Sequence, residues 1–207
     1  AACCTAARVT PASAIVEIEG RATASTPLVA ACARALRRLG ETGRALALAV
    51  EELEHKGFWV LTADDGRYPA RLRARLGDAA PAMLYGVGDQ ALLGIDGVGI
   101  VGSRDIGPES AEVAGQVARF AATRGVPVVS GGARGVDRKA MNAACEVGGA
   151  AVGVLADSLL KTVGDSSVRR LVASGQLCLI TPYSPSAPFS TGNAMGRNKI
   201  IYALARG

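Results

Sequence analysis

The sequence has little of what metal sites and acyl-transfer enzymes require. It contains a single histidine, His55, and its five cysteines stand without any C-x-x-C spacing. A zinc site of Cys and His ligands and a Ser-His-Asp triad are therefore poorly supported, and an odd number of cysteines cannot complete a disulfide framework. We expect no metal, a reducing compartment, and a surface position for His55 at the end of a polar helix.

Long apolar runs are missing as well. No run reaches the roughly 18 apolar residues that span a bilayer. The start of the sequence also lacks the charged segment followed by an apolar segment that is typical of a signal peptide. We therefore expect a cytoplasmic protein without membrane contact. The sequence begins with Ala1 rather than methionine, which favours a processed chain or a fragment.

Aromatic residues are scarce at 4%, whereas 49% hydrophobic and 20% charged residues are ordinary values for a globular protein. The length of 207 residues allows one full domain with a small appendage. Lys and Arg number 23 against 18 Asp and Glu, so the formal net charge is +5. This excess modestly favours anionic partners.

The first part of the chain predicts helices. Residues 1–26 have little periodicity and are interpreted as an irregular lead-in. Helical spacing then predicts one helix over Pro27–Leu39, ended by Gly40, and a second over Gly43–Glu54. Residues 1–55 are therefore expected to form a small helical N-terminal appendage.

From residue 56 to residue 207, strands and helices alternate. The predicted strands are Phe58–Leu61, Ile95–Val101, Val126–Ser130, Ala150–Leu155 and Leu177–Thr181. The predicted helices are one opened by Tyr68-Pro69, with Arg71, Arg73 and Arg75, then Glu109–Arg124, Val136–Val147, Ser166–Ser174 and Asn198–Ala205. This alternation predicts an α/β fold: an extended Rossmann-like parallel sheet covered by helices, with ligands at the carboxyl ends of its strands.

One motif is discarded. Residues 97–102 spell G-x-G-x-x-G, but the glycines fall before and within the predicted strand, whereas a dinucleotide fingerprint needs them after it. We therefore expect no nicotinamide cofactor and no other cofactor.

Two loops after predicted strands have the composition of phosphate sites. The first is Gly102-Ser103-Arg104, in which a glycine permits close approach, a hydroxyl donates, and a guanidinium binds two oxygens. A turn with a solvated arginine is the alternative. The second, from Ser130 to Asp137, contains the members Ser130, Gly131, Gly132, Arg134 and Gly135. Its glycines would expose backbone N–H groups to an anion at a helix N-terminus. The alternative is a purely structural role for this loop, in which the glycines permit tight packing of strand and helix and Asp137 caps the helix.

A third segment precedes the last predicted helix. It contains Asn193, Arg197, Asn198 and Lys199, with two cations and two amides at the helix entrance. No acidic residue follows Asp165, so nothing nearby in sequence neutralises these cations. Before it, Tyr183 and Phe189 stand in a proline-rich arm that either stacks on bases or packs on the domain.

Together these segments resemble the DNA-processing protein A family (DprA, also called Smf) over roughly residues 56–205. The motifs that carry the resemblance are Tyr68-Pro69 with Leu72, Pro81 and Leu84-Tyr85, then residues 98–104, 130–137, 192–193 and 197–201. The resemblance implies a dimer that binds single-stranded DNA in a basic pocket and hands it to the RecA recombinase during natural transformation. It also assigns phosphate binding to Arg104, Arg134, Arg197 and Lys199, and adds Lys161 from a pocket loop.

The sequence departs from that family's pattern. Met141 replaces a histidine, Ala194-Met195 replaces an aromatic-proline pair, and residues 162–167 lack the usual Tyr-Pro and Asn. The chain also ends in the helix after Arg197, where the family continues through another strand, so we expect a truncated domain or one completed elsewhere.

We expect a binding protein that catalyses no reaction. The alternatives are a small-nucleotide sensor or phosphoribohydrolase-like enzyme using Asp105, Glu109, Asp137 or Asp157, and a diverged interaction protein that has lost its ligand. The hypothesis requires Arg104, Arg134 and Arg197 to meet in one basic trough at one rim of the sheet. Scattered guanidinium groups, or groups buried in ion pairs with carboxylates, would argue against it.

Overall fold

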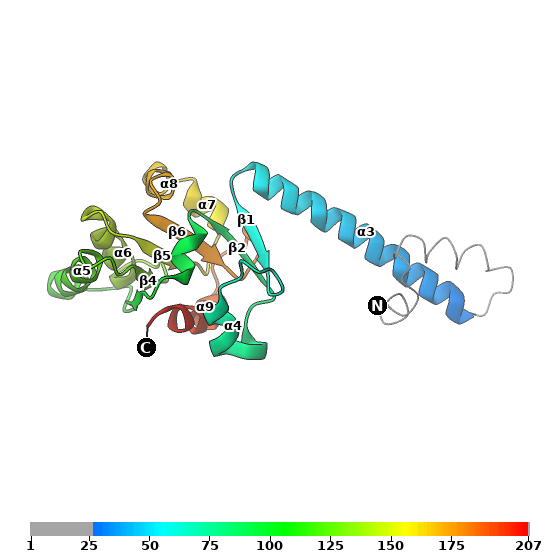
Figure 1. Ribbon diagram of the computed structural model, residues 1–207, viewed down its shortest axis with the longest axis horizontal. Coiled ribbons are helices and arrows are strands. Elements are labelled where there is room, and N and C mark those ends of the chain that lie inside the picture. Colours follow the sequence, from blue (N-terminus) through cyan, green and yellow to red (C-terminus); the bar gives the residue numbers. More distant parts are fainter. Residues whose placement is uncertain (1–26, 207) are drawn as a thin grey trace. The chain divides into compact units, whose positions relative to one another are not determined.

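The computed structural model describes residues 27–206, with side chains from residue 38 onward except that of residue 39. The chain divides into two compact units, residues 1–56 and residues 57–207. Among the described residues, the first unit contributes one helix and the second contains the whole sheet (Figure 1). The irregular lead-in expected for residues 1–26 lies outside the described residues.

One continuous helix, α3 (Pro27–His55), stands in place of the two helices expected in the first unit. The stop expected at Gly40 is therefore wrong. Neither Gly40 nor Gly43 has a positive φ. A glycine inside a helix costs only about 1 kcal/mol relative to alanine, so the helix-forming residues on both sides continue the helix through them. His55 is the exposed last residue of α3, as expected.

The second unit is built on a six-stranded sheet with the order β1-β2-β6-β5-β4-β3. The strands are β1 (Trp59–Thr62), β2 (Met83–Val87), β3 (Val98–Gly99), β4 (Val128–Ser130), β5 (Ala151–Val154) and β6 (Leu177–Thr181). The four strands from β3 to β6 pair in parallel, but β2 runs antiparallel to both β1 and β6. The α/β class is confirmed, whereas the expectation of a wholly parallel sheet is wrong at this edge.

The antiparallel edge is built around an aromatic ring that lies on a glycine. Trp59 of β1 is paired with Gly86 of β2, and a Cβ at Gly86 would lie 2.3 Å from the Trp59 ring. The Trp59 Nε1 also donates a hydrogen bond of 3.0 Å to the Gly88 carbonyl. Residues 83–87 include a glycine and follow no alternating pattern, which is why the sequence did not predict β2.

The helices of this unit are α4 (Ala70–Leu76), α5 (Pro108–Ala122), α6 (Val136–Glu146), α7 (Leu159–Val163), α8 (Ser166–Ala173) and α9 (Thr191–Leu204), with 3-10 turns η1 (Gly77–Ala79) and η2 (Gln90–Gly94). The start expected for the last helix, Asn198, is wrong. The Ser190 hydroxyl accepts the Asn193 N–H at 3.0 Å and caps α9 much earlier. The short α7 was not anticipated, and the Ser158 hydroxyl caps it by accepting the Lys161 N–H at 3.2 Å.

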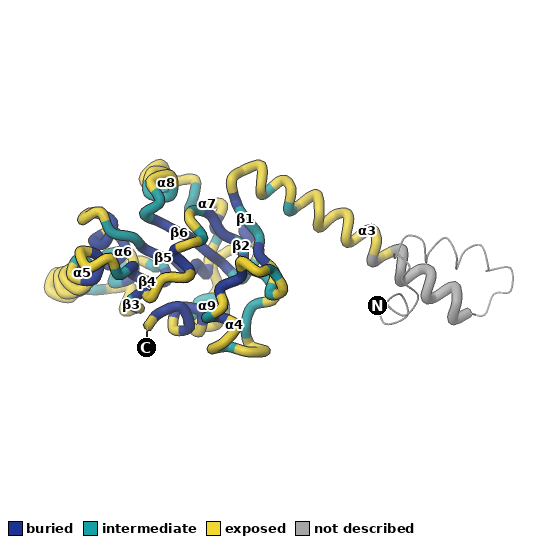
Figure 2. Tube along the Cα trace, viewed as in Figure 1, coloured by how far each residue is buried: buried dark blue, intermediate teal, exposed yellow. Residues whose placement is uncertain are grey.

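Alternate residues of the central strands face opposite sides of the sheet. Val129, Val152 and Ile180 belong to the core cluster that includes Ile200 and Ile201 of α9. On the other face, a Cβ at position 153 would lie 2.8 Å from Met141 of α6. Every residue of β5 and β6 is buried, as in a sheet covered on both faces (Figure 2).

Two arginines of α4 hold the C-terminal end of α9. The Arg71 Nη1 donates to the Leu204 carbonyl at 2.9 Å, and the Arg75 Nη1 donates to the Ala203 carbonyl at 3.3 Å and to the Ala205 carbonyl. These carbonyls lie at the end of a helix, where intrahelical partners run out and cations are favoured. Arg71 and Arg75 therefore fix the helix on which Arg197 stands.

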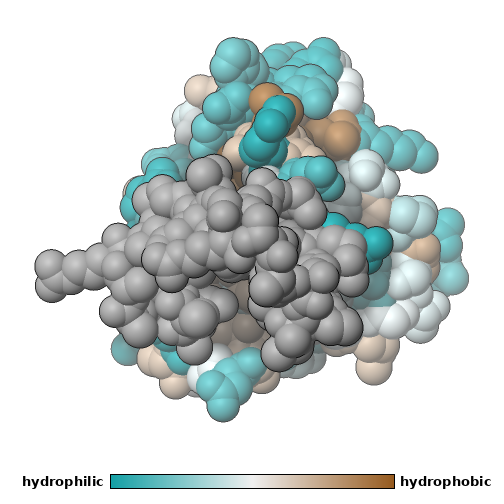
Figure 3. Space-filling view, turned by 90° about the vertical axis from the view of Figure 1, so that its right-hand side faces the viewer, coloured by the Kyte–Doolittle hydropathy of each residue, from teal (hydrophilic) through white to brown (hydrophobic). Residues whose placement is uncertain are grey.

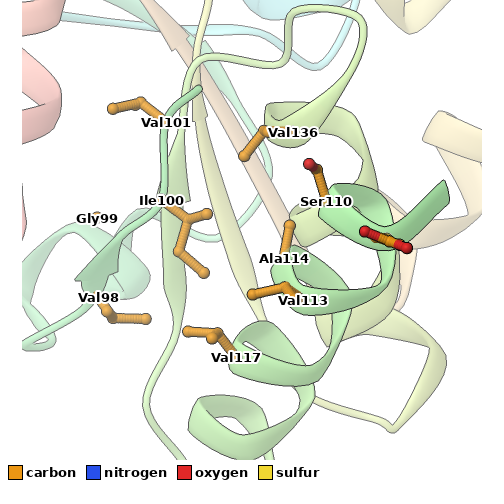
Figure 4. A pocket seen from close by; sticks show the side chains of 10 residues that line it. Val98, Gly99, Ile100, Val101, Ser110, Val113, Ala114, Val117 and Val136 are labelled. Carbon is orange, nitrogen blue, oxygen red and sulfur yellow. The ribbon is translucent and has the colours of Figure 1, made fainter. Parts of the chain in front are cut away.

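The sheet ends at β3, which is much shorter than the strand expected over Ile95–Val101. Its sheet partner is β4 alone, so fewer ladder hydrogen bonds define it. A groove between β3 and α5 is lined by apolar side chains, among them Val98, Ile100, Val113 and Val117 (Figure 4). Glu109 is the one charged residue among those that line it, so this groove does not suit an anion.

Both polar and large hydrophobic side chains are exposed on the described residues, the latter including Val113, Phe120 and Met195. On the face that Figure 3 presents, hydrophobic residues form small separate patches among hydrophilic ones. None of the helices described here is both long and apolar enough to cross a membrane.

Candidate functional site

Four arginines from three segments of the chain line one cavity of about 350 Å³, here called the arginine cavity. Its lining residues are Arg104, Gly131, Gly132, Ala133, Arg134, Arg138, Ala156, Asp157, Phe189 and Arg197. Arg104 follows β3, residues 131–134 follow β4, and Ala156 follows β5. Because these strands are parallel, their carboxyl ends meet at one edge of the sheet, where ligands of such folds bind.

Arg197 is the buried cation of this cavity. It stands on α9 and is only 5% exposed, and its Nη2 lies 3.6 Å from the Asp137 Oδ2. Within the described part of the chain, its Nε and Nη1 are buried without a hydrogen-bond partner. A Cβ at Gly131 would lie 1.6 Å from Nη1, so only glycine leaves room for this guanidinium. Burial lowers the pKa of Arg197 and the Asp137 carboxylate opposes this shift, but an arginine stays protonated at neutral pH.

Asp137 connects the two glycine loops and Arg197. This residue of α6 is 3% exposed, and its Oδ1 accepts the Gly102 N–H while its Oδ2 accepts the Gly131 N–H, both at 3.2 Å. The helix capping that the sequence suggested for Asp137 is not found, because the N-cap of α6 is Gly135 and no side chain caps it. One carboxylate fixes the loop after β3, the loop after β4 and the guanidinium from α9 in a single arrangement.

The rim of the cavity carries more exposed groups. The Arg104 guanidinium lies 4.4 Å from the centre of the Phe189 ring, and both side chains are exposed. Arg134 forms an exposed ion pair with Asp105. Cation–π contacts and exposed ion pairs are each worth about 1 kcal/mol or less. A phosphate oxygen can therefore displace either partner at small cost.

The expected convergence of Arg104, Arg134 and Arg197 on one cavity is found, but Arg197 is buried beside the carboxylate of Asp137, an arrangement that the sequence hypothesis named as an argument against it. Two of the three lie beside carboxylates, Arg134 beside Asp105 and Arg197 beside Asp137. The expectation that nothing nearby neutralises Arg197 is therefore wrong, because Asp137 reaches it from a different part of the sequence. Arg104 and Arg138 form no ion pair with any carboxylate of the described residues, so the cavity keeps unpaired positive charge.

Lys199 does not belong to the arginine cavity. Its Nζ donates a hydrogen bond of 2.6 Å to the Ala79 carbonyl, and it lines a separate groove with Tyr183. The predicted basic pair is split because residues 192–199 lie inside α9 rather than at its entrance. Two residues along an α-helix are about 200° apart, so Arg197 and Lys199 occupy opposite sides.

Lys161 lies next to the arginine cavity without lining it. It stands on α7 and lines a neighbouring cavity of about 490 Å³, together with Met141 and Cys145. The two cavities share Gly132, Arg138 and Asp157. Burial raises the pKa of the Cys145 thiol to about 11, so this cysteine is not a reactive thiolate at neutral pH.

The serines and the remaining glycines of the predicted loops have structural roles. The Ser130 hydroxyl is buried and donates to the Ile100 carbonyl at 2.6 Å, while the Ser103 hydroxyl donates to the Asp105 carbonyl at 2.8 Å. A Cβ at Gly102 would lie 2.7 Å from Val136, and Gly135 has a φ of 89°. These four residues shape the loops around the arginines.

The amides of α9 are less involved than expected. Asn193 is half-buried, and its carbonyl accepts the Tyr183 hydroxyl at 2.9 Å. That contact anchors Tyr183, so Phe189 is the aromatic residue of the arm that lines the cavity. Asn198 is half-buried and does not line the arginine cavity.

Sequence reasoning missed Arg138 and the bridging role of Asp137. Arg138 stands in the first turn of α6, four residues after Arg134 of the preceding loop, and its place directly after the glycine loop was visible in the sequence. The role of Asp137 depends on Gly102 and Arg197, which are distant in the chain, so no local pattern indicates it. Asp157 is the one carboxylate among the residues that line the arginine cavity, and it belongs to the exposed class.

The arrangement suits an oxyanion carried by a flexible chain. It offers a buried guanidinium with unpartnered N–H groups, three more exposed guanidinium groups, and an exposed aromatic ring on which Arg104 lies. Guanidinium groups bind phosphate oxygens in bidentate fashion, and aromatic rings stack on unpaired bases.

Comparisons with known proteins agree with this geometry. Residues 59–207 match the family described as DNA recombination-mediator protein A. The chain is 31% identical over 170 residues to a DNA processing protein DprA of Mycobacterium tuberculosis, covering 76% of this chain and 43% of that protein. It is also 31% identical over 158 residues to the protein Smf of Escherichia coli, covering 75% and 41%. The chain thus spans less than half the length of these curated relatives.

Two solved structures share the fold. The DNA processing protein A of Streptococcus pneumoniae superposes with a TM-score of 0.61 at 28% identity, covering 72% of this chain and 52% of that one. The DNA processing protein A of Helicobacter pylori, studied for its single-stranded DNA binding mode, gives a TM-score of 0.56 at 25% identity and covers 72% and 66%.

Proposed function

Because the chain belongs to the DNA recombination-mediator protein A family, we propose that it binds single-stranded DNA through backbone phosphates in the arginine cavity. The single observation that carries this proposal is the convergence of four arginines on one cavity, one of them buried with free N–H groups. The related protein of Helicobacter pylori, whose structure concerns single-stranded DNA binding, supports the choice of ligand.

Phosphate contacts give affinity without reading sequence. Arg197 supplies the buried contact, and Arg104, Arg134 and Arg138 surround it. Phe189 at the rim can stack on an unpaired base, which duplex DNA does not offer. The site therefore favours single strands of any sequence.

The biological role of this DNA binding is part of the same proposal. We infer that the protein catalyses no reaction, acts in the cytoplasm, and passes single-stranded DNA to the RecA recombinase during natural transformation. Of the carboxylates that the enzyme alternative would use, Asp105 pairs with Arg134 and Asp137 accepts two backbone N–H groups, whereas Asp157 is exposed and lines the arginine cavity. Release of free base from nucleoside monophosphates would instead favour the phosphoribohydrolase-like alternative.

The test is an anisotropy titration with single-stranded and double-stranded oligonucleotides at about 50 and about 200 mM salt. Affinity for the single strand should be higher and should fall steeply with salt, because bound phosphates release their counterions. Arg104→Ala should weaken every sequence alike and reduce the slope of log K against log salt by about one.

Arg170→Ala is the matched control, because Arg170 is exposed on α8 and does not line the arginine cavity. It should leave the slope unchanged. Binding that is insensitive to salt, or an equal loss in both variants, would contradict the proposal.

A further inference from the structure

A second cavity adjoins the arginine cavity and is built differently. It is the cavity of about 490 Å³ that Lys161 lines, here called the Met141 cavity. Its lining comes from α6, α7, α8 and β6 and from the residues that follow β4 and β5 (Figure 1). Leucine and methionine side chains contribute to this lining, whereas the arginine cavity has neither. The two cavities therefore suit different chemical groups.

The floor of the Met141 cavity is apolar and buried. Leu155, Leu177 and Leu179 are each at most 4% exposed, and Met141 is 7% exposed. A Cβ at Gly153 would lie 2.6 Å from Leu179 and 2.8 Å from Met141, so these two side chains meet over the backbone of β5. A nucleobase can lie with its faces on apolar side chains of this kind, and a thioether contacts aromatic rings favourably.

The rim of the Met141 cavity is polar. Its exposed residues include Arg138, Asn142, Asp157 and Lys161. Within the described part of the chain, these four side chains form no hydrogen bond or ion pair, so their donors and acceptors are available to a ligand. The other carboxylate of the rim, Asp165, already accepts a backbone N–H at 2.7 Å as the N-cap of α8. An apolar cavity with a few polar groups is typical of sites for small organic ligands.

The two cavities are continuous. Gly132, Arg138 and Asp157 line both of them. Gly132 lies against Leu155, because a Cβ there would come within 2.8 Å of that side chain. A side chain at position 132 would therefore stand where the cavities meet. A ligand with an anionic group and an aromatic ring on a short linker can occupy both cavities at once.

A nucleotide is a ligand of this kind. Its phosphate suits the guanidinium groups of the arginine cavity, and its base suits an apolar slot whose rim offers hydrogen bonds to the base edge. We propose that the two cavities together bind one nucleotide, with the phosphate beside Arg197 and the base on Met141, and that a free nucleoside monophosphate therefore competes with single-stranded DNA. This inference rests on the DNA-binding proposal in taking the arginine cavity as the phosphate site.

Calorimetric titration of the full chain with three probes tests the role of the base. The probes are deoxyadenosine monophosphate, deoxyribose 5-phosphate, which lacks the base, and deoxyadenosine, which lacks the phosphate. The nucleotide should bind at least about tenfold more tightly than either fragment, because only the nucleotide fills both cavities. A nucleotide that binds no more tightly than deoxyribose 5-phosphate would show that the base has no site, and would overturn the proposal.

Val168→Trp tests where the base binds. Val168 is half-buried on α8 and lines the Met141 cavity but not the arginine cavity, so an indole at this position fills the space that the base needs. The affinity for the nucleotide should fall at least about tenfold, whereas the affinity for deoxyribose 5-phosphate should not change. Equal nucleotide affinities in the wild type and Val168→Trp would overturn the proposal.

Ala173→Trp is the matched control, because it adds the same side chain at an exposed position of α8 that does not line the Met141 cavity. It should bind the nucleotide as the wild type does. Far-UV circular dichroism checks that each variant is folded. Leu171→Phe, a smaller filling of the same cavity, takes the place of Val168→Trp if the indole unfolds the chain.

Competition against a labelled single-stranded oligonucleotide tests the regulatory part of the proposal. Deoxyadenosine monophosphate should displace the oligonucleotide from the wild type, and about tenfold more of it should be needed with Val168→Trp. If the nucleotide and the oligonucleotide both bind but neither displaces the other, they occupy separate places, and the proposal is wrong.

An abasic oligonucleotide distinguishes a free nucleotide from one unit of a DNA strand. If a base of the strand also enters the Met141 cavity, the difference in affinity between the normal and the abasic strand should be smaller in Val168→Trp than in the wild type. If the cavity receives free nucleotides alone, that difference should be the same in both. Either result, together with tight binding of the free nucleotide, supports the site and assigns its source.

Failure of this inference and failure of the DNA-binding proposal give different results. A wild type that binds single-stranded DNA but binds the nucleotide no more tightly than deoxyribose 5-phosphate contradicts this inference alone. A wild type that binds the nucleotide through its base but binds no single-stranded DNA contradicts the DNA-binding proposal and leaves the nucleotide site in place.

Discussion

Arg197→Met is expected to remove most single-stranded DNA binding and to destabilise the second unit at the same time. The binding loss follows from losing a charge-assisted contact worth about 1.5–3 kcal/mol, which corresponds to a roughly 10- to 100-fold weaker complex. The stability loss follows because Asp137, 3% exposed, is left as a buried carboxylate without its cation. Removing one partner of a buried ion pair costs about 3–5 kcal/mol.

These two effects can be separated with a second substitution. Adding Asp137→Asn to Arg197→Met removes the uncompensated charge, so urea denaturation should show that part of the stability returns. DNA affinity, measured where both variants are folded, should stay low because the guanidinium is still missing. Recovery of affinity together with stability would mean that Arg197 acts on the fold alone.

Gly131→Ala is expected to displace the Arg197 guanidinium without removing any charge. The new methyl carbon would lie 1.6 Å from Nη1, so either the side chain leaves its place or the loop after β4 shifts. The Gly131 N–H also donates to Asp137, so a shift of the loop loosens that contact as well. We expect at least a roughly tenfold loss of DNA affinity and a cost of about 1–3 kcal/mol in stability.

Gly94→Ala is the matched control for this substitution. A Cβ at Gly94 meets no atom within 4 Å, and Gly94 has no positive φ. Both affinity and urea midpoint should therefore stay at their wild-type values. Unchanged DNA affinity in Gly131→Ala would show that the position of Arg197 does not matter for binding.

The parts of the fold that follow from local pattern were predictable from the sequence. Leu177–Thr181 is β6 as expected, and α5, α6 and α8 lie close to their predicted ranges. Elements defined by neighbours rather than by pattern were not predictable. The strand β2 depends on Trp59 packing on Gly86, and the short β3 reflects a single sheet partner.

The candidate site, too, was predictable only where it follows from local sequence pattern. Arg104, Arg134 and the glycine loop could be found because they follow predicted strands, and parallel strands end at one edge. The start of α9 was misplaced because Gly192 and Gly196 hid a helix whose cap is Ser190. That error put Lys199 beside Arg197, whereas the helix places them on opposite sides. The pairing of Asp137 with Arg197 spans sixty positions of sequence, which no local reading can connect.

The most direct measurement of the central claim is a double-mutant cycle between the cavity and a DNA phosphate. Oligonucleotides in which single phosphates are replaced by neutral methylphosphonates are titrated against wild type and Arg104→Ala. At one position, neutralising the phosphate should weaken binding to the wild type by about 1.5–3 kcal/mol and should weaken binding to Arg104→Ala much less. Additive losses at every position would show that Arg104 contacts no phosphate and would contradict the account.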